Sequence, residues 1–165
     1  MTATYEKIAT TTLGSTAATV TLSSISGSYT DLILITNSAT GSNDIDMYLQ
    51  VNSDTGSNYS WTRLQGSGTV AGSARGTSSS LGYRVGNMSG SNVGQNNTII
   101  QFQNYSNTTT YKTILSKSNN PAFLVEAFVG LWRSTSAITS MDIKAGTGSF
   151  SVGSTFTLYG ILKEA

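Results

Sequence analysis

Apolar residues recur at every second position in short runs of this chain, and this alternation constrains the fold more than any other feature. In the run 44–51, DIDMYLQV, the residues Ile45, Met47, Leu49 and Val51 are apolar. Side chains of an extended backbone point alternately to opposite faces, so these residues share one face of a strand. Helical spacing of apolar residues is not sustained anywhere in the chain. The sequence therefore predicts an all-β protein.

Short strands separated by turn-forming residues predict an antiparallel architecture. The spacers, such as 37–44 and 52–58, are rich in Gly, Ser and Asn. We predict strands at Tyr5–Thr11, Thr16–Leu22, Asp31–Asn37, Ile45–Val51, Ser60–Gln65, Leu81–Val85, Thr98–Tyr105, Tyr111–Lys117, Phe123–Trp132, Ile138–Ala145 and Ser154–Leu162. This pattern is typical of a two-sheet β-sandwich. We expect one jelly-roll-like sandwich domain over residues 1–165, with no linker or second domain and with its last strand paired inside a sheet.

Two regions depart from simple alternation. The run 31–37, DLILITN, is apolar on both faces, which predicts a central strand or one buried on both sides. The segments 66–80 and 86–97 are rich in Gly, Ser and Asn, and we expect both to be exposed loops.

The composition excludes several classes of function. The chain has no Cys and no His, and Lys, Arg, Asp and Glu make up 10% of it, while Ser and Thr supply nearly a third. Without His or Cys the common nucleophilic triads cannot form, so we do not expect an enzyme or a cofactor. A net charge of +1 without a basic cluster argues against nucleic-acid binding. No apolar run approaches the about 20 residues that span a bilayer, so membrane insertion is not expected.

Two groups of acids are candidate sites. Asp44 and Asp46 suggest calcium, but the fixed ligand offsets and the distal Glu of an EF-hand are missing, and solubility is the favoured explanation. The strand 123–132 places Glu126 on one face with Leu124, Phe128, Gly130 and Trp132, and places Phe123, Val125, Ala127, Val129 and Leu131 on the other. Glu126 is either a buried acid with a raised pKa or, the favoured alternative, an acid on a partly covered face that pairs with Arg133 or Lys112.

Aromatic residues supply the binding candidates. In 58–66, NYSWTRLQG, the residues Tyr59, Trp61 and Arg63 fall on one face of a strand. An exposed set of this kind suits stacking on a sugar or anchoring a protein interface. The alternative is that Trp61 caps the sandwich core. Trp132, at a strand end, is expected in the core.

Six segments, taken in order, resemble a known family. They are TYEKIATTTLGS, SSISGSYTDLILI, NSDTGSNYSWTRLQG, NYSNTTTYKTILSKSN, VGLWRSTSAITSMDI and GSTFTLYGI. Together they resemble a module of tailed bacteriophages, especially cyanophages, that occurs as small capsid surface proteins and at the distal ends of tail fibres and tailspikes. The resemblance covers essentially the whole chain. It implies a β-sandwich that works as a homotrimer on the particle surface, without catalytic residues.

The resemblance leaves two roles open. Because the module begins by about residue 4, we expect a stand-alone cement or decoration protein on the outer capsid. Its partners would be other copies of itself and the major capsid protein, with one end of the sandwich against the shell. The alternative is the tip of a tail fibre or tailspike that binds host-surface glycan through Tyr59, Trp61 and Arg63. A glycan-cleaving enzyme is disfavoured.

Overall fold

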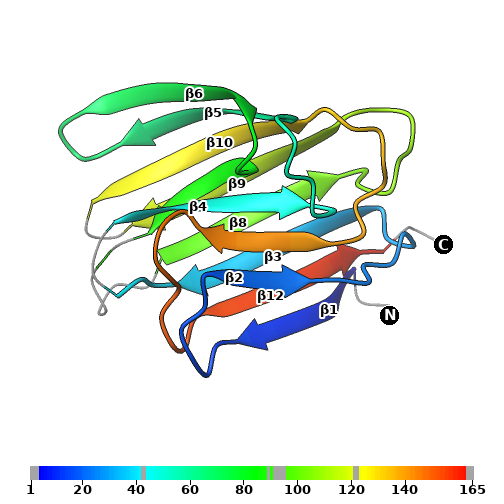
Figure 1. Cartoon of the computed structure of the whole chain (residues 1–165), viewed down its shortest axis with the longest axis horizontal. Coiled ribbons are helices and arrows are strands. Elements are labelled where there is room, and N and C mark those ends of the chain that lie inside the picture. The colour runs from blue at the N-terminus through cyan, green and yellow to red at the C-terminus, as the bar shows by residue number, and fades with distance from the viewer. Residues whose placement is uncertain (1–3, 42–43, 89, 91–95, 121–122, 163–165) are drawn as a thin grey trace.

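The computed structural model describes residues 4–41, 44–88, 90, 96–120 and 123–162 (Figure 1). In this part of the chain all regular structure is β-strand, arranged in two antiparallel sheets. The strands are β1 (Tyr5–Thr12), β2 (Thr19–Leu22), β3 (Asp31–Ser38), β4 (Ile45–Val51), β5 (Tyr59–Gly66), β6 (Ala71–Ser79), β7 (Tyr83–Met88), β8 (Asn96–Gln103), β9 (Lys112–Asn120), β10 (Leu124–Trp132), β11 (Met141–Ala145) and β12 (Thr155–Ile161). The prediction of an all-β sandwich is confirmed.

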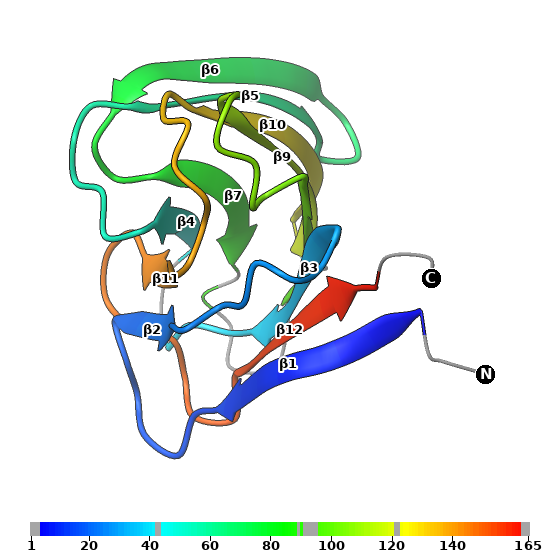
Figure 2. The same ribbon diagram turned by 90° about the vertical axis from the view of Figure 1, so that its right-hand side faces the viewer.

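The two sheets are unequal in size. The large sheet has the order β1-β12-β3-β8-β9-β10-β5-β6, and the small sheet has the order β2-β11-β4-β7. The large sheet curls around the small one, so that β6 and β1 lie at the two ends of a curved wall and β7, β4, β11 and β2 lie inside it (Figure 2). Strand β12 pairs with both β1 and β3, which confirms that the last strand lies inside a sheet.

The chain crosses repeatedly between the sheets. Strands β1, β3, β8 and β12 of the large sheet are each joined in sequence to a strand of the small sheet. The remaining four strands of the large sheet, β9, β10, β5 and β6, come from two antiparallel hairpins. These hairpins pair with each other through β10 and β5, and they extend the large sheet beyond β8. We call this half of the large sheet the extension.

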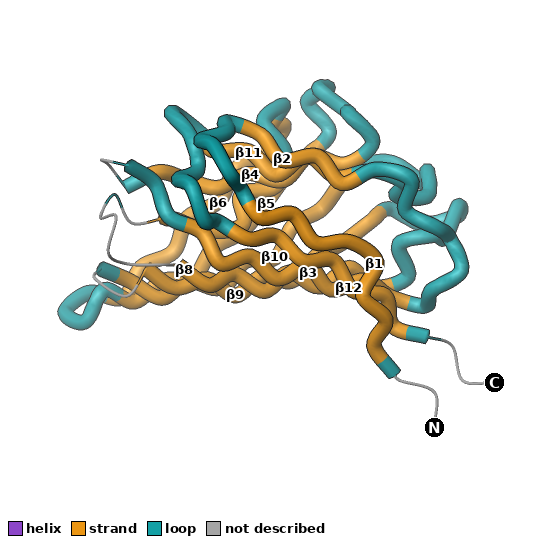
Figure 3. Tube along the Cα trace, turned by 90° about the horizontal axis from the view of Figure 1, so that it is seen from below, coloured by secondary structure: helices purple, strands orange, loops and turns teal. Residues whose placement is uncertain are grey.

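The core lies between the two layers (Figure 3). From the large sheet, Leu34 and Ile100 are fully buried, and from the small sheet Met47 and Leu49 are fully buried. Every second residue of each strand therefore packs against the facing sheet. The removal of these side chains from water is the main stabilising effect in such a fold. The face predicted from Ile45 to Val51 is confirmed as a core face.

Strand β3 is central in its sheet and is not buried on both sides, so the first of the two predicted alternatives holds. It lies inside the large sheet between β12 and β8, as predicted. Leu32 and Leu34 point into the core, but Ile35 on the opposite face is 38% exposed. Its apolar residues on both faces therefore do not mean burial on both sides, because no described segment covers the outer face of the large sheet.

The prediction of a long loop over 66–80 is wrong for most of its length. Residues 71–79 form β6, the edge strand of the extension. Glycine is required at position 76, because a Cβ there would lie 2.6 Å from Cε2 of Trp61. The Gly content of this segment, which led to the prediction of a loop, thus partly reflects packing of a strand against an indole. In the segment 86–97, β7 extends to Met88 and β8 begins at Asn96, while residues 89 and 91–95 are outside the described residues.

Gly130 provides a test of the packing between the extension and the small sheet. A Cβ at this position would collide with the ring of Tyr83 on β7 and would lie 2.7 Å from Cγ1 of Ile114. Overpacking of this kind costs about 1–3 kcal/mol. We expect Gly130→Ala to lower the free energy of unfolding by that amount in urea. Gly14→Ala is the control, since its Cβ would have no neighbour within 4 Å; equal losses from the two variants would contradict the packing.

Candidate functional site

The predicted binding residues share one face of β5, but this face points into the sandwich. Tyr59 is fully buried. Its hydroxyl donates to the carbonyl of Val51 at 3.2 Å and accepts from the Val51 N–H at 3.1 Å. Its ring lies between Tyr83 and Trp132, with centroids at 5.1 and 6.4 Å. The prediction of a surface position for Tyr59 is therefore wrong, and the expected core position of Trp132, 3% exposed, is confirmed.

Trp61 packs at the edge of the small sheet and is partly buried. Its indole lies over Gly76 of the neighbouring strand and meets Phe128 edge to face, with ring centroids 6.4 Å apart. The guanidinium of Arg84, on β7, lies 5.5 Å from the indole centroid, within range of a cation–π contact. Trp61 thus contacts the extension and the small sheet together, in agreement with the alternative that it caps the core.

Arg63 belongs to an ion-pair network around Glu126. Its Nη1 donates to Oε1 of Glu126 at 3.0 Å, and Nη2 of Arg84 lies 3.9 Å from the same oxygen. Arg84 also pairs with Oδ1 of Asp46 on β4 at 2.5 Å. Two acids and two bases from β4, β5, β7 and β10 therefore neutralise one another along the edge of the small sheet. We call Trp61, Arg63, Arg84, Glu126 and Phe128 the inner cluster.

The buried-acid interpretation of Glu126 is correct, and the favoured pairing with Arg133 or Lys112 is wrong. Arg133 donates to the carbonyl of Asn58, and the Lys112 ammonium donates to the carbonyls of Thr110 and Thr135. The side chain of Glu126 is 0% exposed. Burial raises the pKa of Glu126, while Arg84 and Arg63 act in the opposite direction. Sequence reasoning missed both partners because they lie on strands far from β10 in the chain.

The inner cluster has the properties of a structural contact. Its charges are paired within the chain, and no group of three or more potential metal-ligating His, Cys, Asp or Glu residues occurs in the described part. Asp46 is committed to Arg84, and Asp44 accepts the N–H of Gly90 at 3.0 Å. The glycan-binding role of Trp61 and Arg63 stays a prediction.

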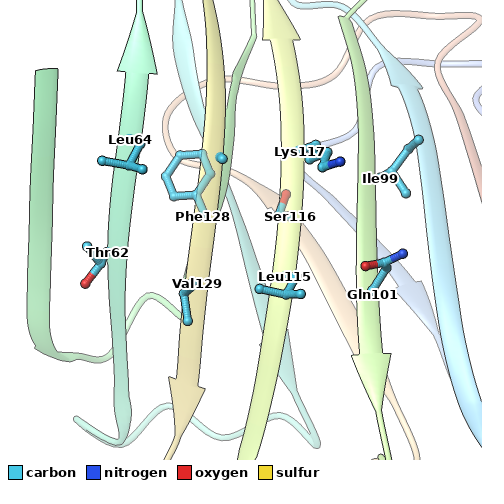
Figure 4. Close-up of a pocket in the computed structure, with 10 residues that line it drawn as sticks. Thr62, Leu64, Ile99, Gln101, Leu115, Ser116, Lys117, Phe128 and Val129 are labelled. Atoms are coloured by element: carbon cyan, nitrogen blue, oxygen red, sulfur yellow. The ribbon is translucent and has the colours of Figure 1, made fainter. Parts of the chain in front are cut away.

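The outer face of the large sheet carries a second candidate site. Large apolar side chains from five neighbouring strands point away from the core there, each 38–64% exposed: Ile35, Ile99, Leu115, Val125, Val129 and Leu64. We call these residues the outer patch. They are neighbours across the strands, since Ile35 pairs with Ile99 and Leu115 pairs with Val129. Figure 4 shows the centre of this surface, with Leu115, Val129 and Leu64 on adjacent strands.

The outer patch is hollowed. A hollow of about 540 Å³ has Leu64, Ile99, Leu115, Ala127 and Val129 in its lining, together with polar groups from Thr62, Gln101 and Lys117 (Figure 4). Two smaller hollows of about 310 and 320 Å³ adjoin it and share lining residues with it. The site is therefore a broad apolar depression with a few polar groups, of the kind that receives a ligand or a partner.

The apolar residues on both faces of strand 123–132 are the sequence signal for the outer patch, and the prediction assigned the two faces the wrong way round. Strand 123–132 is apolar on both faces, and we expected the face with Glu126 and Phe128 to lack cover. The structure buries that face and exposes Val125 and Val129. Phe128 and Trp132 are the larger side chains, and Arg63 and Arg84 compensate the one buried acid, so the face with Glu126 is the one that packs.

Comparisons with known proteins found no matching family model, no matching characterised protein and no matching solved structure. Among the described residues, no helix has the length and apolar character needed to cross a membrane.

The raised pKa of Glu126 predicts a pH dependence of stability. Because burial disfavours its charged form, the folded chain binds this proton more tightly than the unfolded chain does. The stabilising contribution is therefore present below the ordinary carboxyl value of 4.5 and is lost as pH rises through the raised pKa. We expect the free energy of unfolding of the wild type, relative to Glu126→Gln, to fall with increasing pH.

Urea unfolding of both proteins from about pH 4 to pH 8 measures this difference. Glu6→Gln, on the exposed strand β1, reports the effect of removing a carboxylate outside the inner cluster. A difference between wild type and Glu126→Gln that stays constant or rises with pH would contradict the assignment.

Proposed function

We propose that this chain is a non-enzymatic structural protein of a tailed-phage particle, a homotrimeric cement or decoration protein that bridges and stabilises capsid subunits. The observation that carries the proposal is the outer patch. Contiguous exposed apolar surface on a folded domain is typical of protein–protein contact. A protein that bridges neighbours needs such a surface, while it needs neither catalytic groups nor a bound cofactor.

The path of the chain through the sandwich supports the proposed fold in its finer form. Strands β1 to β4 alternate between the two sheets, and so do β10 to β12. This alternation supports a jelly-roll-like topology to which the hairpins β9–β10 and β5–β6 have been added. Jelly rolls are common in viral capsid and lectin domains. The proposal rests further on the ordered motifs that resemble the phage surface module.

The trimer is part of the same proposal. Closed symmetric assembly is the usual state of homo-oligomers, and a trimer presents each contact surface three times. Once one subunit of the trimer has bound the shell, the other two are held close to their own sites. Several modest contacts can therefore give a stable attachment. Sparse charge, at 10% of residues, leaves apolar and hydrogen-bonding contacts as the main source of affinity.

The receptor-binding alternative, a glycan-binding tip of a tail fibre or tailspike, gains no specific support. It depended on Tyr59, Trp61 and Arg63 as surface residues, and Tyr59 is fully buried while Arg63 is paired with Glu126. A weak host-surface role in addition to cementing belongs to the same proposal.

Counting copies in purified particles tests the proposed role. Quantitative mass spectrometry is expected to find this chain at a copy number comparable with that of the major capsid protein. A copy number that is a small fraction of the shell subunit would place it on the tail and favour the receptor-binding alternative. Absence from particles would refute both.

Sedimentation of the purified chain tests the trimer separately. We expect a species of about three times the 17.3 kDa mass of one chain. A monomer at every accessible concentration would remove the trimer from the proposal while leaving attachment to the shell open to the particle measurement.

A further inference from the structure

We propose that the outer patch docks a protein surface that presents apolar side chains around a carboxylate, and that Lys117 pairs with this carboxylate. The inference rests on the proposed function, because it names the chemistry of the partner that a bridging protein would hold. It goes beyond that function by assigning the surface, the pairing residue and the sign of the partner's charge.

Lys117 lies within the apolar surface. On β9 it is paired in register with Ile99 on one side and Ala127 on the other, and it lines the hollow of about 540 Å³ together with Leu115 and Leu64. It forms no ion pair with any described residue. An ammonium group covered by an apolar partner loses its hydration, so a partner that fits must supply a compensating acceptor. A carboxylate supplies the strongest one.

The charged side chain near the centre of the outer patch is a cation. On the outer face of β8, β9, β10, β5 and β6, the charged side chains are Lys117 and Arg75. Asp31, at the start of β3, lies on the same face and accepts the backbone N–H of Asn104. Glu126, the acid carried by these five strands, points to the inner cluster. Two outer patches facing each other with Lys117 near their centres would bring two cations together, which disfavours that arrangement of a second copy. A partner with an acidic residue is complementary.

The size of the outer patch indicates a macromolecular partner. It runs from Ile35 on β3 to Leu64 on β5, across four strand spacings, which correspond to about 19 Å. The three adjoining hollows extend it along β10 and β5. A surface of this width extends beyond any single hollow, and it suits the apolar centre of a protein interface with a charged pair inside it.

A random peptide display library tests this chemistry directly. The library is selected on the full-length wild-type chain and depleted on Leu115→Ser/Val129→Ser, which removes two exposed apolar contacts and leaves the core face of both strands unchanged. We expect the enriched peptides to combine apolar residues with Asp or Glu. Binding of a purified enriched peptide is expected to weaken about tenfold or more on Lys117→Glu, and to recover when the peptide acid is replaced by Lys.

Lys7→Glu is the matched control, because Lys7 is also exposed on the large sheet but lies on β1. It is expected to leave peptide binding unchanged, and amide NMR spectra of all variants check that the fold is retained. Enriched peptides without acids, or equal weakening by Lys7→Glu and Lys117→Glu, would overturn the proposal.

Sedimentation of the wild type and of Leu115→Ser/Val129→Ser tests the competing occupant. We expect both proteins to show the same oligomeric state. If the double variant dissociates an assembly that the wild type forms, the outer patch is covered by a second copy and the docking proposal fails. That outcome would leave the particle measurement of the proposed function unaffected, so the two failures are distinguishable.

Discussion

The packing of the four-stranded sheet against the inner face of the eight-stranded sheet is the contact on which the rest of the structure depends. It buries Leu34 and Ile100 of one sheet against Met47 and Leu49 of the other and so removes the main apolar surface from water. The mismatch in strand number has a direct consequence. Half of the large sheet comes from two hairpins, and the small sheet contacts them mainly through its edge strand β7. The inner face of this extension therefore needs additional side chains to cover it.

Arg84 and Glu126 provide this cover. Arg84 extends from the edge strand over Trp61 and Phe128, and both Arg63 and Arg84 lie near the same carboxylate oxygen of Glu126. A buried charge network of this kind is weak as a source of net stability, but removing one member leaves the others uncompensated. The network therefore ties the orientation of β10 to that of β5 and β7. Because strand side chains alternate, a shift of one residue would reverse every side chain of β10.

The orientation of β10 also determines the surface of the protein. With Phe128 and Trp132 turned inward, Val125 and Val129 are turned outward, and they join Leu115, Ile99 and Leu64 on adjacent strands. The same alternation that builds the core thus builds an exposed apolar face. In a chain with few charges, Lys117 is then distinctive, because it places a cation inside a surface that is otherwise suited to an apolar partner.

The sequence by itself determined the strand content, most strand positions and the core face of residues such as Ile45 to Val51, because the alternation of side chains along a strand is a local property. It also placed Tyr59, Trp61 and Arg63 on one face. Only the tertiary structure decided which face of each strand is covered: Tyr59 and Glu126 point inward, Val125 and Ile35 outward, and residues 71–79 form a strand beside Trp61. The reason is that coverage depends on packing partners distant in the chain. Strands with two apolar faces carry no local information about which of the two another sheet will cover.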